Sequence, residues 1–208
     1  TLNSVGVELA QSDLVRNHFF MVLGEKADTL YEKYWVPIEK NLGRNFEAFF
    51  QHYLVCNGQG SVAAKSVYKA YLKYKLSELD QEPKNAEKEL KRLKQFADVY
   101  SEIVDPPSQT REEHKKKLKH LKEWGTKGYE RPILLRAMYL LSKNKIDAEE
   151  VVKVCKYLES YMVRRALVGY FTNNLNTWLS SIGSSLASVE KNFSDILMEK
   201  LSAREWPS

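Results

Sequence analysis

The chain has 208 residues, of which 43% are hydrophobic and 28% are charged. This balance excludes a disordered chain and provides enough apolar surface for a sizeable core. Only 9 Gly and 6 Pro are present, which argues against an all-β or loop-rich protein and favours long helices. The sequence has no run of 18 apolar residues and no signal peptide, so we expect no membrane partner. A net charge of +5 is compatible with nucleic acid as a partner without requiring it.

The cysteines indicate the cellular compartment, and the chain ends indicate the relation of this chain to a longer protein. Cys56 and Cys155 lie in apolar helical patterns, which predicts buried thiols in a reducing compartment, the cytoplasm, rather than a disulfide. The first residue is Thr1 instead of Met, and the last three are Trp206-Pro207-Ser208. We therefore expect a segment of a longer protein.

Helical spacing begins near the N-terminus. A first helix is predicted to start with Ser12 or Asp13 as its N-cap and to end at Gly24. Its buried face is expected to hold Leu14, Val15, His18, Met21 and Val22.

Three further helices are predicted before residue 80. One runs from about 26 to 35 and is broken or kinked at Pro37. The next covers about 45–57, and the third covers about 63–79. The third should bury one stripe of side chains, formed by Tyr68, Leu72, Leu76 and Leu79.

The second half of the chain is predicted to be helical as well. A long helix at about 85–104 has apolar residues at spacings of three and four, and a lysine-rich helix follows at about 111–124. Asp147 is a good N-cap for a later helix, and Glu150 completes a capping-box-like pair with it. The remaining expected helices lie at about 131–143, 147–169, 174–188 and 193–203.

These segments together predict an all-α fold, an irregular bundle of about nine to ten helices with no significant sheet. Residues 1–208 are expected to form a single helical domain. A subdivision into 1–58 and 59–208 is the alternative.

No pattern of catalytic, metal-ligating or nucleotide-binding residues stands out. The four histidines lie on different predicted helices and lack partners at ligand spacing, so no metal site is expected. Gly58-Gln59-Gly60 follows a helix rather than a strand and lacks the lysine of a phosphate loop, so it is interpreted as a turn. We therefore expect no catalytic residue and no bound cofactor in this segment.

A basic segment lies in the middle of the chain. Residues 111–122 hold six Lys or Arg, and the 16 basic and 11 acidic residues of 61–128 account for the whole net charge. One interpretation is a solvated helix face, and the other is contact with nucleic-acid phosphates. The candidate phosphate contacts are Lys115, Lys116, Lys119, Lys122 and Arg164.

Two polar side chains fall where a helix face should be apolar. Arg165 borders the apolar face expected at 147–169, and Arg164 points away from it. A guanidinium beside a core face needs a partner, because an unpaired buried charge is costly. Asn17 lies between apolar positions of the first helix, and a buried amide there is expected to bind the backbone of residues 2–4.

Several of these residues belong to motifs that resemble the GmrSD-type family. The first block reads Leu2-Asn3-Ser4-x-Gly6-x-x-Leu9-x-x-x-Asp13-Leu14-Val15-Arg16-Asn17. The helix that follows it in the family resembles Tyr31-x-x-Tyr34-Trp35-x-Pro37-Ile38-Glu39. A later block reads Glu159-Ser160-Tyr161-x-x-Arg164-Arg165-Ala166-x-x-Gly169-x-x-Thr172-Asn173-x-Leu175-Asn176. The order and separation of the blocks also match, so the resemblance covers nearly the whole chain.

The resemblance implies a modification-dependent restriction protein that acts against phage DNA. Such proteins begin with a ParB/sulfiredoxin-like domain, whose DGQQR motif is implicated in nucleotide binding and hydrolysis. Many end in an HNH-like nuclease domain with a His-x-x-Pro motif. This chain has neither motif, so the resemblance implies the helical segment that links the two catalytic domains.

In that interpretation Asn3, Asp13, Arg16, Asn17 and Arg165 are interface or structural residues. Asn3, Arg16 and Asn17 would face the N-terminal domain, while Arg164 and Arg165 would either brace the helices or contact nucleic acid. The flanking domains would be the partners, and an NTP and a divalent metal would be cofactors of the parent protein rather than of this segment. The alternatives are an autonomous helical DNA-binding module and a protein-interaction module, neither of them catalytic.

Overall fold

The computed structural model describes residues 9–79, 83–106, 112, 116, 118, 119, 128–169 and 174–203. Within these residues the regular structure is helical, with no strand, so the all-α class is confirmed. The α-helices are α1 (Gln11–Leu23), α2 (Ala27–Leu30), α3 (Val36–Leu42), α4 (Phe46–Cys56), α5 (Val67–Leu79), α6 (Pro83–Val104), α8 (Arg131–Ser142), α9 (Ala148–Leu167), α10 (Leu175–Ser185) and α11 (Phe193–Ser202).

The expected count of nine to ten separate helices is wrong: the elements from α1 to α4 follow one another without a gap, so the helical elements of the described residues form seven continuous helices. The sequence predicts a break or a kink at Pro37. α2, a π-helical segment at Tyr31–Trp35 and α3 follow one another without a gap, so the break is wrong. Proline has no N–H to donate, and the wider π turn before it changes the hydrogen-bond pattern there, so the helix continues. The lysine-rich helix expected at about 111–124 lies largely outside the described residues.

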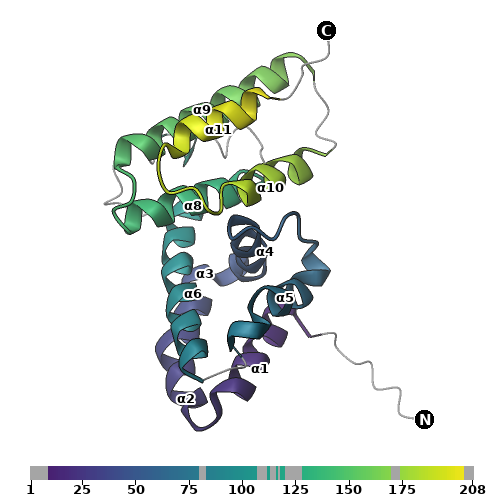
Figure 1. Ribbon diagram of the computed structural model, residues 1–208, viewed down its shortest axis with the longest axis vertical. Coiled ribbons are helices and arrows are strands. Elements are labelled where there is room, and N and C mark those ends of the chain that lie inside the picture. The colour runs from purple at the N-terminus through teal and green to yellow at the C-terminus, as the bar shows by residue number, and fades with distance from the viewer. Residues whose placement is uncertain are drawn as a thin grey trace, which may run out of the picture.

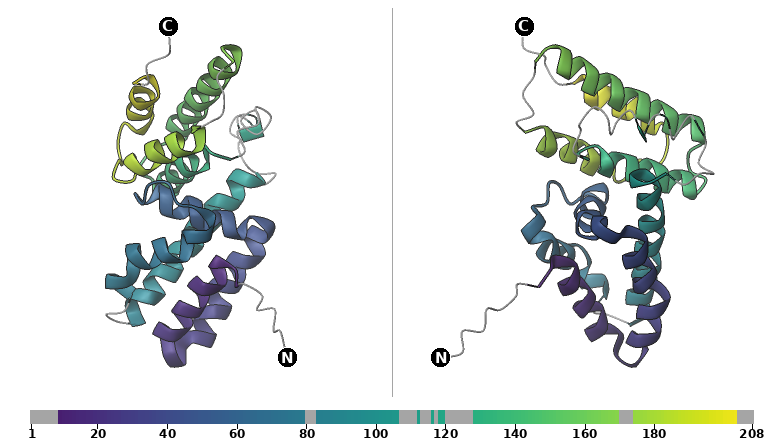
Figure 2. Two further views of the ribbon diagram at one scale, coloured as in Figure 1. Left: turned by 90° about the vertical axis from the view of Figure 1, so that its right-hand side faces the viewer. Right: turned by 180° about the vertical axis from the view of Figure 1, so that it is seen from behind.

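The helices form two groups that meet along α6 (Figure 1). The lower group comprises α1 to α5 with most of α6, and the upper group comprises α8 to α11. α6 contacts α1, α3 and α5 in the lower group and α8 in the upper group, while α4 contacts α8 and α10. Figure 2 shows the same division from the side and from behind.

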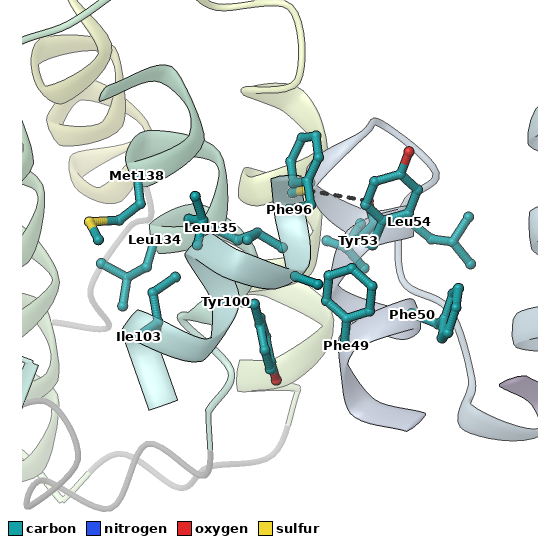
Figure 3. Packing of buried hydrophobic residues seen from close by; sticks show 14 of the residues in the cluster. Phe49, Phe50, Tyr53, Leu54, Phe96, Tyr100, Ile103, Leu134, Leu135 and Met138 are labelled. Atoms are coloured by element: carbon teal, nitrogen blue, oxygen red, sulfur yellow. Dashed lines mark hydrogen bonds between the residues drawn. The ribbon is translucent and has the colours of Figure 1, made fainter. Parts of the chain in front are cut away.

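One hydrophobic core runs through both groups. In Figure 3 the side chains of α6 lie between the aromatic rings of α4 and the aliphatic side chains of α8. The rings of Phe49 and Tyr100 meet edge to face with centroids 5.5 Å apart. The rings of Phe96 and Tyr139 stack at 3.8 Å. α6 is therefore packed on both sides.

The start of α1 differs from the prediction. Its N-cap is Ala10, which makes no side-chain cap bond, and Ser12 lies inside the helix. Both the backbone N–H and the hydroxyl of Ser12 donate to the carboxylate of Glu47 on α4. The first turn of α1 is thus capped by another helix. Its end is as predicted, because Gly24 adopts a φ of 53°, a left-handed conformation that glycine takes without strain.

The buried face of α1 is rotated relative to the prediction. Val15 is buried as expected, but Met21 is 73% exposed. Phe19 and Leu23 are buried instead. Since Val15, Phe19 and Leu23 recur every four residues, they lie along one side of the helix. Asn17 and Met21, on another side of the helix, therefore point outward.

The N-terminus of α9 agrees with the prediction in one respect and differs in another. Asp147 accepts a hydrogen bond from the backbone N–H of Glu150 at 2.8 Å, which confirms the N-cap. The carboxylate of Glu150 instead accepts the backbone N–H of Ser194, in the first turn of α11, at 2.8 Å. An acidic group at a helix N-terminus is stabilising, so Glu150 holds α11 against α9.

Candidate functional site

The residues predicted to face a neighbouring domain lie together on α1. The Nη1 atom of Arg16 is 3.0 Å from Oδ1 of Asp13 and 3.9 Å from Oε1 of Glu39 on α3. Asp13 is therefore an ion-pair partner of Arg16 rather than an N-cap. Asn17 is exposed, so the prediction of a buried amide is wrong, because the helix is rotated. Asn3 lies outside the described residues.

A small apolar pocket lies beside this ion pair. Its lining includes Arg16, Phe20, Tyr31, Trp35 and Leu90. Trp35 is buried, and its indole Nε1 has no hydrogen-bond acceptor among the described residues. Arg16 belongs to the first sequence block of the resemblance, while Tyr31 and Trp35 belong to the second. The fold thus brings the two blocks to one place.

Large apolar side chains are exposed on or next to α1, at the end of α9 and at Met198 on α11. Leu9 and Met21 lie near opposite ends of α1, and we call Met21 with the neighbouring Asn17 the α1 surface; Leu167 and Val168 at the end of α9 form the α9 surface. The four apolar side chains at α1 and α9 are each more than half exposed. α1 belongs to the lower group, and the end of α9 lies in the upper group (Figure 1). Exposed apolar side chains that occur together mark binding surfaces more often than isolated ones do.

The last turn of α9 separates two arginines in the way the sequence predicts. Arg165 is buried, and its Nη1 donates to the hydroxyl of Tyr161 at 3.4 Å. The ring of Tyr161 stacks on Trp178 of α10 with centroids 4.8 Å apart. Arg164 is exposed, and its Nε donates to the carbonyl of Ser160 at 3.3 Å. Arg165 therefore braces α9 against α10 through Tyr161, while Arg164 faces outward.

Two of the predicted phosphate-contact lysines are described by the structure. Lys116 and Lys119 are both exposed, whereas Lys115 and Lys122 lie outside the described residues. Exposure is required both for a solvated helix face and for contact with nucleic-acid phosphates, so the two interpretations remain open.

A buried charged cluster, which the sequence analysis missed, joins α4, α5 and α6. The Oε2 atom of Glu89 lies 3.5 Å from Nζ of Lys75 and 3.7 Å from Nη1 of Arg92. Its Oε1 atom accepts hydrogen bonds from the hydroxyls of Tyr53 at 2.6 Å and Tyr71 at 3.3 Å. We call these five residues the Glu89 cluster. Every oxygen of the buried carboxylate is thus satisfied, as stability requires.

This cluster explains why the first half of the stripe predicted for α5 is wrong, while the side chains of Leu76 and Leu79 lie outside those that the structure describes. The buried positions of α5 are Val67, Tyr71 and Lys75, spaced four apart. Tyr68 and Leu72, which were expected inside, are only half-buried. A lysine is rarely buried unless it is paired, and its partner Glu89 lies on the next helix. The spacing from Val67 to Lys75 is the one signal in the sequence that indicates this face.

The raised pKa values of Tyr53 and Tyr71 keep both hydroxyls protonated, so that they donate hydrogen bonds to Glu89. Burial raises the pKa of Tyr53 and of Tyr71 well above the usual value, and Glu89 raises both further. Both side chains therefore remain neutral phenols that donate. Burial alone would lower the pKa of Arg92, but Tyr53, Tyr74 and Glu89 raise it overall. Arg92 consequently stays charged beside the carboxylate.

A second polar chain crosses from α4 through α6 to α8. The Nδ1 atom of His52 lies 2.8 Å from the hydroxyl of Tyr100, and Nη1 of Arg131 donates to the same hydroxyl at 3.4 Å. Burial lowers the pKa of His52 to about 3, and the charge of Arg131 also lowers it. His52 is therefore neutral near pH 7 and contributes a hydrogen bond rather than a charge.

The described residues hold no group of three or more His, Cys, Asp or Glu placed to bind a metal ion. In the same part of the chain, no helix is both long and apolar enough to cross a membrane. Cys56 and Cys155 are free and buried, as predicted. The Glu89 cluster and the hydrogen bonds of Tyr100 with His52 and Arg131 both join one helix to another, so these polar groups stabilise the packing of the helices.

Comparison of the chain with protein-family models, with curated proteins and with solved structures found no match.

Proposed function

We propose that this chain is a helical connecting domain of a GmrSD-like, modification-dependent restriction protein of the cytoplasm. The sequence blocks at residues 2–17, 31–39 and 159–176 support the family. The all-α fold, with charged groups engaged in bracing helices, supports a connecting role rather than a catalytic one. In this proposal an NTP-binding domain and an HNH-like nuclease domain lie on either side, and the NTP and the divalent metal belong to them.

The observation that carries the proposal is the presence of two exposed apolar surfaces in different helix groups (Figure 1). Met21 on the α1 surface is 73% exposed and Leu167 on the α9 surface is 79% exposed. The α1 surface adjoins Arg16, and the α9 surface adjoins Arg164, so each lies within or next to a sequence block of the family. A domain bound at each surface would be held apart by the core between them.

The core between the two surfaces is suited to passing a displacement from one domain to the other. α6 packs on helices of both groups, and the Glu89 cluster fixes α4 and α5 against it. A close-packed interior transmits strain instead of absorbing it. A change of nucleotide state at the α1 surface would therefore alter the position of the nuclease at the α9 surface.

The proposal is tested in the full-length protein that contains this segment. Met21→Glu and Leu167→Glu each place a charge in one of the two interfaces, so each should lower NTP-dependent DNA cleavage by about tenfold or more. Met198→Glu on α11 is the control, because Met198 is an exposed methionine outside both surfaces. Cleavage at the wild-type rate by both interface variants would contradict the proposal.

A second test uses the 208-residue chain alone. It should neither hydrolyse NTP nor cleave DNA above the buffer blank, because both catalytic motifs of the family are missing from it. Robust activity of either kind would overturn the connecting role.

The alternative function, an autonomous DNA-binding module, is favoured by the exposure of Lys116, Lys119 and Arg164. Phosphate contacts of this kind release counterions, so duplex binding should weaken steeply as salt rises. Titration of labelled DNA at low and high salt checks this, and negligible binding at low salt would remove the alternative.

A protein-interaction module is tested by light scattering of the chain beside the full-length protein.

A further inference from the structure

The joint between the two helix groups holds a buried arginine that lacks a hydrogen-bond partner. Arg136 of α8 is 7% exposed, and its Nε is fully buried. No residue in the described part of the chain forms a hydrogen bond or a close ion pair with its guanidinium. A buried N–H in this state is costly, since the hydration that Nε has lost is not replaced.

Arg92 of α6, which lies near Arg136, cannot serve as a partner. Burial lowers the pKa of Arg136, and the charge of Arg92 also lowers it. Arg92 itself is engaged: it lies 3.7 Å from the carboxylate of Glu89 and donates to Tyr74 and to the side-chain oxygen of Asn57. Lys75 shares that same carboxylate. The negative charge of Glu89 is thus already neutralised by Lys75 and Arg92, and it does not compensate the charge of Arg136.

The other acidic group at this joint is Glu190, in the turn between α10 and α11. It favours the charged form of Arg136, but it is half exposed and forms its ion pair with Lys145, at 3.2 Å. The remaining cation that acts on Arg136 is Arg92, which lowers its pKa. Positive charge therefore exceeds negative charge around Arg136.

The thiol of Cys56, at the end of α4, also leaves Arg136 without a counter-charge. A thiolate at this position would neutralise the guanidinium. Burial raises the pKa of Cys56 to about 12, although Arg136 and Arg92 both lower it. Cys56 therefore stays a neutral thiol at physiological pH.

We propose that Arg136 is the centre of an oxyanion-binding site at the joint of α4, α6 and α8, and that the site takes a phosphate group. Arg136 supplies the hydrogen bonds, while Arg92 supplies positive charge beside them. The planar fork of a guanidinium matches two phosphate oxygens at once, and such charge-assisted bonds are strong. A bound phosphate would supply the counter-charge that the chain lacks there.

The position of this site gives it a structural effect. α6 extends into the lower group, α8 belongs to the upper group, and α4 contacts both. An anion held between their side chains would tie the two groups together, so binding should stabilise the folded chain. This inference does not depend on the proposed function, because it rests only on the charges at the joint.

The binding test uses inorganic phosphate and the intact chain, with calorimetric titration against chloride at matched ionic strength. Arg136→Met keeps the apolar stem and removes the fork, so it should weaken phosphate binding roughly tenfold or more. Lys145→Met is the matched control, because it removes one cation from the same joint but leaves Arg136 in place. Equal phosphate affinity in Arg136→Met and wild type would overturn the proposal.

A second measurement keeps the proposal testable if Arg136→Met does not fold. The buried Nε–H of Arg136 in the wild-type chain is followed by NMR while phosphate is added. A phosphate-dependent shift that chloride does not produce supports the site, and an unchanged signal at saturating phosphate rejects it.

The source of the phosphate group is separated by two further titrations. A nucleoside triphosphate that competes with inorganic phosphate, while a short DNA duplex does not, identifies a small-molecule ligand. Competition by the duplex identifies a nucleic-acid backbone instead. If neither competes, inorganic phosphate itself is the ligand.

Discussion

The Nζ atom of Lys75 on α5 lies 3.5 Å from the Oε2 atom of Glu89 on α6, and both side chains are 6% exposed. Water cannot solvate either charge fully, so the neighbouring groups must do so. Arg92 adds a second cation, while Tyr53 and Tyr71 donate to the other carboxylate oxygen. A network satisfied on all sides holds its elements in one arrangement. Three helices of the lower group therefore meet at a single carboxylate.

Glu89→Gln should be among the most destabilising substitutions of the chain. It removes the negative charge and leaves Lys75 and Arg92 buried without it, which typically costs about 3–5 kcal/mol. Urea unfolding followed by circular dichroism measures the loss. Glu190→Gln is the control, since its exposed pair with Lys145 should contribute less than about 1 kcal/mol. Similar losses in both variants would contradict the role assigned to Glu89.

His52 should make the chain less stable as the solution becomes acidic. The pKa of His52 is lowered from 6.5 to about 3 in the folded chain, so the unfolded chain binds a proton first. Its contribution is complete above pH 6.5 and decreases as the pH falls toward 3, by up to about 1.4 kcal/mol per pH unit.

Urea unfolding between pH 7.5 and pH 5 tests this dependence, because most carboxylates stay ionised over that range. His52→Gln should show a flatter dependence than wild type. Parallel curves for the two proteins would refute the assignment to His52.

Glu150→Ala should loosen α11. The carboxylate accepts the backbone N–H of Ser194 at 2.8 Å, and loss of such a cap costs about 0.5–2 kcal/mol. Hydrogen exchange of the first turn of α11 should speed up, while exchange in α6 should not. Glu149→Ala, an exposed acid on the same turn of α9, is the control and should leave α11 unaffected. Equal effects of the two substitutions would mean that α11 is held by other contacts.

Gly183→Val should disturb the packing between the two helix groups. A Cβ atom at this position would lie 3.3 Å from Cβ of Pro132 and 3.5 Å from side-chain carbons of Ile133 and Val55. The two further methyl groups of valine would overpack the site, which typically costs about 1–3 kcal/mol. Thermal unfolding measures the loss. Ser181→Val on the exposed side of α10 is the control, and a comparable loss there would point to helix propensity instead.

The sequence predicts helix positions well where the signals are local. α9 begins at the predicted Asp147, and α1 ends at the predicted Gly24, because capping acts within one turn. Which side of a helix is buried depends on its neighbours. Met21 and Phe19 illustrate this, since both are apolar and only the packing of α1 on other helices decides which is inside.

The charged residues of the interior were not predicted, for a related reason. Lys75 and Glu89 each look like a surface charge on their own helix, and only the packing of α5 on α6 brings them within 3.5 Å. Arg136 likewise lies in an apolar helix whose neighbours α4 and α6 are distant in sequence. Arg165 was predicted to lie beside the core because Val151, Cys155, Leu158 and Met162 define that face within one helix.

Because α6 carries core residues that pack on both groups, neither group can unfold without exposing part of α6 to water. Partial unfolding would thus expose apolar side chains of α6 to water, while the group that stays folded would gain no conformational entropy to offset that cost. The two groups should therefore share one cooperative transition, and calorimetry should record a single heat-absorption peak. A weakness introduced at one end of the molecule would then lower the melting temperature of the other end by the same amount.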